Sequence, residues 1–484
     1  MTNTPQPINA EVIAVFPNEV RIAVDDLASF KHAEESLRVG SYLKVSDNDN
    51  VALMCIIESF SIELREDKEK KTQRVYIIDA YPLGTLKSGK FKRGGDELAI
   101  PPKKVTPATA KEVASIFETA FEAKDRFGFA VLTRHRDIAV PVHGDRFFNK
   151  HIAVVGATGS GKSHTIASIL QQAVSVKATA FTGLNNSHIV IFDIHSEYKT
   201  AFPAANIIGV NDLQLPFWLL NAEEMEEMFL ESGDNNNYNQ ASLLRSVVTL
   251  CKESANPSAS KVYFDSPLPY SIKEVVDCLT NLTRETKDAD NDLHIVAGVE
   301  DKTFATNDEK LKWFCSGPLE FAAKKTCKIN KGSYADGTID KFVRRLSSKI
   351  GNPRLQFLFG AKVSALTFEE VLQQFMGYKP SKEANVTILD LSGIPFEVLS
   401  ITVSLITRLL FDYSYYSRRL TSNCDTPLLL VFEEAHKYAP RSDMARYRAS
   451  LTAIERVAKE GRKYGTSLLI ASQRPSEISE TIFS

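Results

Sequence analysis

The sequence predicts an α/β protein in which a parallel sheet with helices on both faces follows a small antiparallel β-barrel. Three observations carry this prediction. Five short apolar runs alternate with helical patterns in residues 146–215 and 383–484. Residues 1–100 contain almost only strand signals, and residues 216–382 show mainly helical periodicity. We therefore expect a barrel, a linker with a helix and a hairpin (101–145), and one sheet in two portions separated by a large helical insertion.

Composition is ordinary for a globular protein: the 484 residues are 43% hydrophobic and 24% charged. The net charge of −2 excludes a wholly basic protein that coats nucleic acid, but it leaves room for a basic channel or patch. The six cysteines form no C-x-x-C pair, which disfavours a zinc site and favours a reducing compartment. No apolar run has the length of a membrane helix and the N-terminus lacks a signal-peptide pattern, so we expect a cytoplasmic protein without membrane contact.

Strand signals separated by turn clusters fill the N-terminal region, at residues 11–16, 20–24, 41–45, 51–59 and 75–81. Short strands at this spacing predict a small barrel. A basic cluster follows among glycines, formed by Lys87, Lys90, Lys92 and Arg93. It either contacts a phosphate backbone or lies at a solvated hairpin tip, and the hairpin tip is the commoner case. Prolines 101, 102 and 107 then mark the linker, with a helical pattern over 108–122 and a hairpin pattern over 127–133 and 137–142.

A glycine-rich loop follows the first core strand, Ile152–Val155, and opens onto an apolar-periodic helix. Its octet GATGSGKS fits G-x-x-x-x-G-K-[ST], the P-loop, whose backbone amides and helix N-terminus bind phosphate oxygens. Lys162 reaches the β- and γ-phosphates in such a loop, and the Ser163 hydroxyl binds Mg²⁺. We expect an ATP site formed by Gly156, Ala157, Thr158, Gly159, Ser160, Gly161, Lys162, Ser163 and His164.

Acidic residues follow two of the other core strands. The run at 428–432 ends in Glu433-Glu434, the pattern of a Walker B strand. One carboxylate there completes the Mg²⁺ site and the other positions the attacking water, and we assign these roles to Glu433 and Glu434 respectively. Asp193 ends the strand at 188–192 and is a further metal candidate, although it could instead cap the loop that follows. A solvated carboxylate pair at a helix start is the alternative for Glu433-Glu434.

Two residues near the C-terminal end are candidates for sensing the phosphate. Gln473 follows the last core strand, 467–471, where an amide can contact the γ-phosphate or simply satisfy the strand end. Arg462 ends a helical pattern that begins at Met444, and it is the candidate arginine finger across a subunit boundary. Arg456, Lys459 and Arg474 compete with it for that role.

Helical patterns dominate the insertion, at residues 222–230 (with Asn221 as N-cap), 240–251, 272–283, 309–314, 338–350 and 368–375. No catalytic constellation lies among them. Beyond the insertion, the fourth apolar run at 386–391 precedes a long helix over 398–418.

The N-terminal barrel and the ordered segments GATGSGKS, DIHSEY, ILDLSGIP, VFEEAHKY, EGRKYG and ASQRPSEI together resemble the HerA-type ATPases of the HerA/FtsK superfamily. The resemblance implies a RecA-like motor that forms a homo-hexameric ring around double-stranded DNA. It implies a barrel that docks an effector subunit, either a nuclease or a sirtuin-like NAD-hydrolase, in DNA end processing or anti-phage defence. It also implies that Lys162 and Ser163 hold phosphate and Mg²⁺, that Glu434 is catalytic and that Gln473 is the sensor. Such proteins usually continue past the Q-R-P segment, so we expect a C-terminal brace to be missing after Ser484.

Two functions fit these features. One is a motor that translocates on or unwinds duplex DNA. The other is a nucleotide-gated scaffold that assembles and regulates an effector with little productive translocation. A small-molecule P-loop kinase fits poorly, because it has no use for the barrel, the insertion or the terminal Gln-Arg-Pro.

Overall fold

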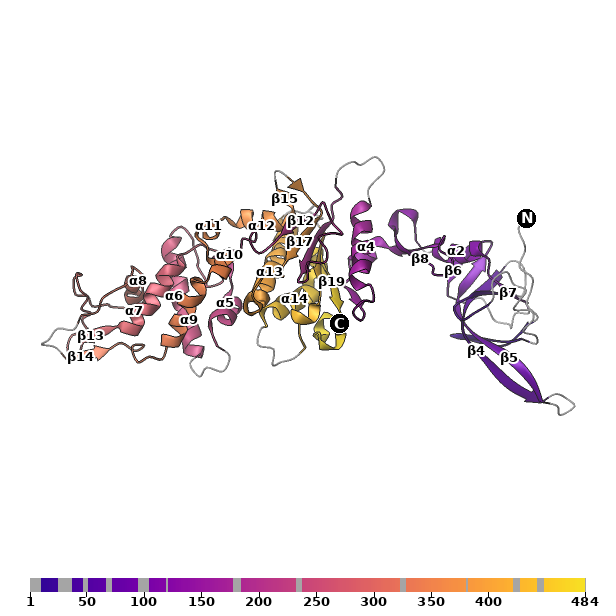
Figure 1. The fold of residues 1–484 in the computed structure, drawn as a ribbon, viewed down its shortest axis with the longest axis horizontal. Helices are drawn as coiled ribbons and strands as arrows, with labels where there is room; N and C mark the ends of the chain where they lie inside the picture. Colours follow the sequence, from indigo (N-terminus) through magenta and orange to yellow (C-terminus); the bar gives the residue numbers. More distant parts are fainter. Residues whose placement is uncertain are drawn as a thin grey trace. The chain divides into compact units, whose positions relative to one another are not determined.

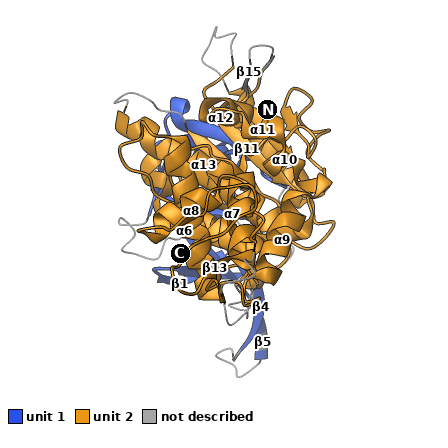
Figure 2. Ribbon diagram, turned by 90° about the vertical axis from the view of Figure 1, so that its left-hand side faces the viewer, with its two compact units in different colours: residues 1–147 blue, residues 148–484 orange. Residues whose placement is uncertain are grey.

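The computed structural model describes residues 10–24, 37–46, 51–66, 72–94, 104–118, 121–176, 184–231, 237–322, 328–379, 382–420, 427–441 and 448–483. The chain divides into two compact units, residues 1–147 and 148–484 (Figure 1 and Figure 2). None of the described helices is both long enough and apolar enough to cross a membrane.

Unit 1 is built on a seven-stranded antiparallel sheet. Its strands are β1 (Ala10–Phe16), β2 (Glu19–Val24), β3 (Tyr42–Ser46), β4 (Val51–Glu66), β5 (Thr72–Lys87), β6 (Lys90–Arg93) and β7 (Lys104–Pro107). They follow the order β1-β2-β5-β4-β3-β7, with β6 paired to β5. Alternating side chains such as Val20, Ile22, Leu43 and Ile78 form the core. The end strands β1 and β7 lie close together, but no ladder joins them among the described residues, so the predicted barrel is a half-barrel.

The predicted boundary at residue 100 falls inside this sheet, because β7 pairs with β3. The sequence did not reveal β7, which is only four residues long and ends in Pro107 at the edge of the sheet. The basic cluster lies on the β5–β6 hairpin around an exposed Ser88-Gly89 turn, which confirms the hairpin-tip prediction. The helix α2 (Ala110–Glu118), the hairpin of β8 (Arg126–Val131) and β9 (Ala139–His143), and the short helix α3 (Gly144–Phe148) complete the N-terminal part.

Unit 2 is built on a six-stranded sheet in which every pair is parallel. Its strands are β10 (Ile152–Val155), β11 (His188–Asp193), β12 (Asn206–Ile208), β17 (Val386–Asp390), β18 (Leu428–Phe432) and β19 (Thr466–Ser472), in the order β10-β19-β18-β11-β17-β12. The five predicted strands are confirmed. The sixth, β12, was missed because three residues carry no periodic signal.

Helices cover both faces of this sheet, as predicted. On one face, Ile166 and Leu170 of α4 (Lys162–Ser175) pack against Ile189 and Ile191 of β11. On the other, α13 (Phe396–Leu420) and α14 (Ala449–Glu460) pack over Phe192 and its neighbours. Figure 1 shows α4 on one side of the sheet and α13 and α14 on the other. Every residue of β11, β18 and β19 is buried, which explains their continuous apolar runs.

The predicted helical insertion is confirmed as a helical region. It contains α5 (Ala222–Phe229), α6 (Asn237–Ala255), α7 (Ile272–Arg284), α8 (Asn307–Phe314), α9 (Asp340–Ile350), α10 (Gln356–Phe359), α11 (Ala361–Ser364) and α12 (Phe368–Met376). Two short hairpins accompany them: β13 (Thr286–Asp288) with β14 (Ile329–Lys331), and β15 (Tyr378–Lys379) with β16 (Lys382–Glu383). Asn221 caps α5 in a capping box with Glu224, as predicted.

Two predicted helices are shorter than expected. The pattern at 108–122 forms a helix only to Glu118. The pattern from Met444 to Arg462 ends at Glu460, where a 3-10 turn (Gly461–Tyr464) takes over, and Met444 lies outside the described residues. A Cβ at Gly461 would come within 2.6 Å of the Thr466 carbonyl oxygen, so glycine permits this tight return to β19.

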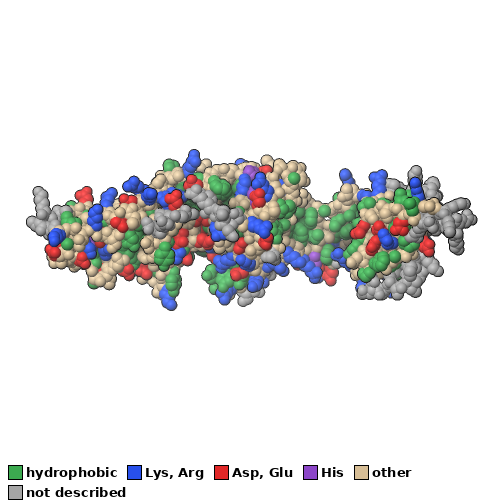
Figure 3. Space-filling view, turned by 90° about the horizontal axis from the view of Figure 1, so that it is seen from below, with side chains coloured by type: hydrophobic (Ala, Val, Ile, Leu, Met, Phe, Trp, Pro, Cys, Tyr) green, Lys and Arg blue, Asp and Glu red, His purple; other side chains and the backbone are tan. Residues whose placement is uncertain are grey.

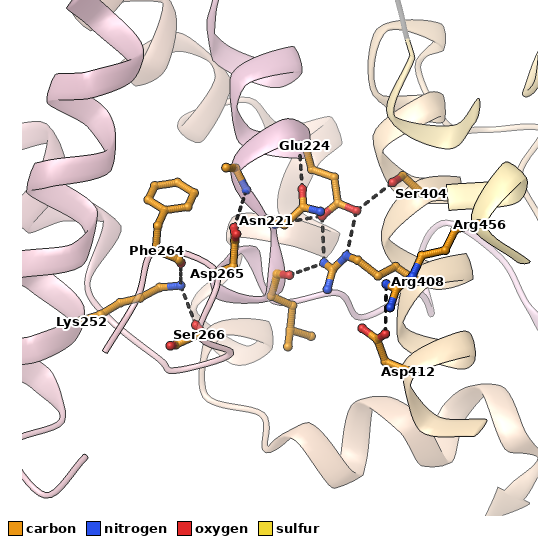
Figure 4. A network of polar contacts seen from close by, with 12 residues as sticks. Asn221, Glu224, Lys252, Phe264, Asp265, Ser266, Ser404, Arg408, Asp412 and Arg456 are labelled. Carbon is orange, nitrogen blue, oxygen red and sulfur yellow. Dashed lines mark hydrogen bonds and ion pairs between the residues drawn. The ribbon is translucent and has the colours of Figure 1, made fainter. Parts of the chain in front are cut away.

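The insertion is joined to the core through a buried carboxylate, Glu224 of α5 (Figure 4). Its oxygens accept from the guanidinium of Arg408 at 2.9 Å and from the hydroxyl of Ser404 at 2.8 Å, both on α13. Arg408 also donates to the Leu219 carbonyl. Because all these groups are satisfied inside the protein, the contact fixes how α5 sits on α13.

Candidate nucleotide-binding and hydrolysis site

The loop after β10 has the backbone that a phosphate cradle requires. Gly159 and Gly161 have φ angles of +76° and +92°, in the left-handed region that side chains avoid. A Cβ at Gly156 would overlap the Ser160 hydroxyl oxygen, so a larger residue there would displace the Ser160 side chain. The fourteen-residue helix α4 starts at Lys162, and its free amides and positive dipole end meet the loop.

The side chains of the loop differ in their exposure. Ala157, Thr158, Ser160 and His164 are exposed, whereas Lys162 is partly buried. Ser163 is also partly buried, and its hydroxyl donates to a carboxylate oxygen of Glu197 at 2.6 Å. Glu197 is thus the group that holds the Ser163 hydroxyl in this structure.

Asp193, at the end of β11, is completely buried. Its carboxylate accepts from the backbone amides of His195 at 3.1 Å, Glu197 at 3.2 Å and Tyr198 at 3.0 Å. This is the loop-capping arrangement that the sequence left open as the alternative to metal binding. It also brings Glu197 back toward Ser163.

Glu433 lies beside this pair at the end of β18. Burial, together with the neighbouring Asp193 and Glu197 carboxylates, raises the pKa of its carboxyl to about 9. Its Oε2 atom is buried and accepts no hydrogen bond from the described residues. Three clustered carboxylates and a serine hydroxyl are oxygen ligands of the kind that Mg²⁺ prefers, so the residues present fit such an ion.

Glu434 has a different set of contacts. Its φ angle of +49° is strained for a residue with a side chain, and it is buried. The Gln473 amide nitrogen donates to Glu434 at 2.5 Å, and the Gln473 amide oxygen accepts from the Thr158 hydroxyl at 2.5 Å. Gln473 therefore bridges the phosphate loop to the candidate catalytic carboxylate. The sequence analysis named both Thr158 and Gln473 but did not predict the contact between them.

His436 is a second neighbour of Glu434. Its Nδ1 atom lies 3.3 Å from the Glu434 carboxylate and 3.3 Å from the Ser472 hydroxyl. Burial lowers the pKa of the His436 imidazole. Its spacing from Glu434 matches no sequence motif, so the contact is visible only in the structure.

Arg462 lies in the 3-10 turn after α14 and contacts none of the groups above among the described residues. Its side chain is exposed, and Nε donates to the Asn149 carbonyl at 3.1 Å. Its three competitors are paired within the chain: Arg456 with Asp412, Lys459 with Glu455 and Arg474 with Glu477. Among the described residues, Arg462 is therefore the candidate without an ion pair, and its guanidinium donates to one backbone carbonyl.

Comparisons with known proteins agree with this architecture. The family model described as the central domain of helicase HerA matches residues 128–410. A probable helicase of Methanocaldococcus jannaschii is 21% identical over 490 residues, covering 97% of this chain and 79% of the relative. The DNA double-strand break repair helicase HerA of Saccharolobus solfataricus is 24% identical over 391 residues, covering 80% of this chain. The chain spans only 62% of that relative's length.

Among solved structures, VirB4 of Thermoanaerobacter pseudethanolicus matches with a TM-score of 0.43 and 13% identity, covering 73% of this chain and 78% of that one. The family model extends from the β8–β9 hairpin through the P-loop and the insertion into α13, which is more than half of the sequence. The chain therefore belongs to the HerA helicase central-domain family and is a P-loop ATPase.

Proposed function

We propose that this chain is the subunit of a ring-shaped, six-membered motor in which ATP hydrolysis drives movement along, or unwinding of, double-stranded DNA. The observation that carries the proposal is the chain of contacts Thr158–Gln473–Glu434, which links the phosphate loop to a catalytic carboxylate. A purely nucleotide-binding domain has no need of this link. The names of the relatives, a double-strand break repair helicase and a probable helicase, supply the substrate class.

In this mechanism the P-loop amides, the N-terminus of α4 and Lys162 bind the phosphates of ATP. Ser163, Glu433 and Asp193 would hold Mg²⁺, with Glu197 releasing the Ser163 hydroxyl to it. When bound, the ion would neutralise part of the negative charge of the phosphates. Glu434 orients a water for attack on the γ-phosphorus and accepts its proton, and Gln473 sets the position of that carboxylate.

The first test is steady-state ATPase activity with and without duplex DNA. We expect Lys162→Ala to weaken nucleotide binding and Glu434→Ala to keep nucleotide bound but uncleaved, each with turnover reduced by about 10² or more. Binding of a fluorescent ATP analogue separates the two defects. Glu369→Ala, which removes an exposed carboxylate of α12, is the control and should hydrolyse normally. Full turnover in Glu434→Ala would overturn the assignment of the water-positioning role.

Contact with DNA should be local, because charges of both signs are interspersed over the face drawn in Figure 3 and the net charge is −2. In contrast to this mixed surface, one hollow of about 1050 Å³ has charged side chains of positive sign alone among its described lining residues. It lies at the carboxyl ends of β12 and β17, where Val210 and Gly393 line it. Of the described residues that line it, Arg354 and Lys362 carry a charge. We place a DNA phosphate contact there.

Each phosphate contact adds about one unit to the steepness of the slope when the logarithm of the binding constant is plotted against the logarithm of the salt concentration. We expect Arg354→Ala and Lys362→Ala to lower duplex affinity independently of sequence and to reduce that slope. Lys312→Ala, an exposed lysine of α8, is the matched control. Unchanged slopes in both variants, measured by fluorescence anisotropy, would place the DNA elsewhere.

The N-terminal sheet is proposed as the dock for an effector, a nuclease or a sirtuin-like NAD-hydrolase, in DNA end processing or anti-phage defence. It carries no nucleotide motif, and the β4 strand exposes Phe60, Ile62 and Leu64 on one face, with 42%, 59% and 68% of each residue accessible.

The second candidate function is a nucleotide-gated scaffold for such an effector. ATP turnover that rises with DNA length favours the motor, whereas full effector activity in Glu434→Ala favours the scaffold.

A further inference from the structure

Three cysteines from three different elements of the insertion meet at one place. Cys251 lies in α6, Cys278 in α7 and Cys315 directly after α8. The sulfur atoms of Cys251 and Cys315 are 3.6 Å apart, although 64 positions separate the residues. Cys278 contacts Cys315 as well, and its thiol also points to the Leu311 carbonyl at 3.6 Å.

The three thiols are not equivalent. Cys251 and Cys278 are almost completely buried, with 1% and 0% of each residue accessible, whereas Cys315 is partly exposed. The thiols of Cys251 and Cys278 both act on Cys315, and this lowers the pKa of the Cys315 thiol. The pKa values of Cys251 and Cys278 are raised by the same interaction and by burial. A partly exposed thiolate next to a protonated thiol is the arrangement found in redox-sensing cysteine pairs.

We propose that Cys315 and Cys251 are a peroxide-sensitive thiol pair that forms a reversible disulfide between α6 and the end of α8. The Cys315 thiolate attacks the O–O bond of a peroxide, which gives a sulfenic acid at Cys315 and releases hydroxide. The Cys251 sulfur then attacks the Cys315 sulfur, the S–S bond forms, and the sulfenic oxygen leaves as water with the Cys251 proton. The peroxide is reduced by two electrons and the thiol pair is oxidised by two.

The geometry selects Cys251 as the resolving thiol. Its sulfur needs to approach from 3.6 Å to the bonding distance of about 2 Å, a shift within the reach of side-chain rotation. Cys278 instead directs its thiol at a backbone carbonyl. A metal site is a poorer interpretation of the three cysteines, because in the described part of the chain they do not form a group that could hold a metal ion by themselves.

Cys55 provides an internal comparison. It is buried in the N-terminal sheet, and burial raises the pKa of its thiol to about 12. We expect Cys315 to react with hydrogen peroxide at least about tenfold faster than Cys55. Because Cys327 and Cys424 lie outside the described residues, the experiment uses the full chain with both replaced by serine.

The test is peptide mapping by mass spectrometry after treatment with hydrogen peroxide. The expected product is a Cys251–Cys315 disulfide that dithiothreitol reverses. In Cys251→Ala, a sulfenic acid should accumulate at Cys315 and be trapped by dimedone, and Cys315→Ala should give neither product. Cys278→Ala should still form the disulfide.

A thermal melt before oxidation shows whether each variant is folded, and the oxidised parent protein should melt at a higher temperature than its reduced form because the bond closes a long loop. Three results would overturn the proposal: a Cys278–Cys315 disulfide as the main product, dimedone labelling of Cys251 in place of Cys315, or equal reaction rates at Cys315 and Cys55.

Discussion

At the scale of single residues, Lys252 of α6 is an unusual buried cation. Only 1% of the residue is accessible, and its Nζ atom donates to the carbonyl oxygens of Phe264 at 2.5 Å and Ser266 at 2.7 Å (Figure 4). The rings of Phe264 and Tyr270 lie 5.7 Å and 5.4 Å from it. Burial, with a smaller contribution from the Arg408 charge, lowers the pKa of this amine to about 8, and the Asp265 charge opposes the shift. Lys252 therefore holds the loop after α6 through two hydrogen bonds, and burial of its charge lowers the free energy of unfolding by an amount that depends on pH.

The sign of this dependence follows from the lowered pKa. Between pH 8 and 10.5 the unfolded chain holds a proton on Lys252 that the folded protein has released, so stability rises with pH in this window. Below pH 8 both states are charged and the full penalty applies. We expect wild type to gain about 1 kcal/mol of unfolding free energy between pH 7 and 9 relative to Lys252→Met.

Urea unfolding of both proteins at each pH measures this difference. Since other groups titrate equally in the two proteins, only the change in the gap between them matters. If the difference in free energy of unfolding between wild type and Lys252→Met is the same at both pH values, or changes to the disadvantage of wild type at pH 9, the pKa of Lys252 is not lowered in the folded protein.

At the scale of elements, α5 holds the core through three of its glutamates. Glu224 pairs with Arg408 of α13. Glu227 accepts from the backbone amides of Arg448 and Ala449 at 2.6 Å and 2.7 Å, where it caps the start of α14, and Glu223 accepts from the Thr452 hydroxyl at 2.8 Å. One short helix of the insertion is thus bonded to both helices that cover one face of the sheet.

We expect Glu224→Ala to lower the free energy of unfolding by about 3–5 kcal/mol, because it leaves the Arg408 charge buried without its partner. Glu226→Ala on the same helix is the matched control. It removes a pair with Arg245, whose side chain is 53% exposed, and should cost less than about 1 kcal/mol. Guanidinium chloride unfolding followed by circular dichroism measures both. Equal losses would mean that the buried pair contributes no more than the exposed one.

The elements were more predictable from the sequence than their contacts. The strands at 188–193 and 428–432 were found because fully buried strands leave continuous apolar runs. Strand β12 was missed because three residues hold no period. The motifs located Lys162, Glu434 and Gln473, but the hydrogen bond from Thr158 to Gln473 joins residues 315 positions apart and depends on strand order, which local pattern does not specify.

At the scale of the whole molecule, the proposed ring requires that each ATP site receive Arg462 from the neighbouring subunit. Co-expression of two inactive variants tests this requirement. Arg462→Ala retains Glu434, and Glu434→Ala retains Arg462, so a mixed ring contains boundaries with both groups intact. We expect the mixture to recover ATPase activity that neither variant shows alone.

The control replaces Arg462→Ala in the mixture by the double variant Glu434→Ala/Arg462→Ala, which cannot form an intact boundary and should recover nothing. Full activity of Arg462→Ala alone would remove this residue from the mechanism. Light scattering of the same samples reports whether they assemble, so failure to form a ring is distinguished from failure to supply the arginine.

The position of the insertion between β12 and β17 has a consequence for synthesis. Strand β11 lies in the middle of the sheet, yet both of its partners, β17 and β18, emerge from the ribosome roughly 200 residues later. At synthesis rates of about 5–20 residues per second, β11 waits on the order of 10–40 s with both edges open. The insertion, whose contacts are largely helical and local, can fold during that interval. The nascent chain therefore carries strand β11 with both edges unpaired while the helical region folds, and this is the period in which chaperones would protect it.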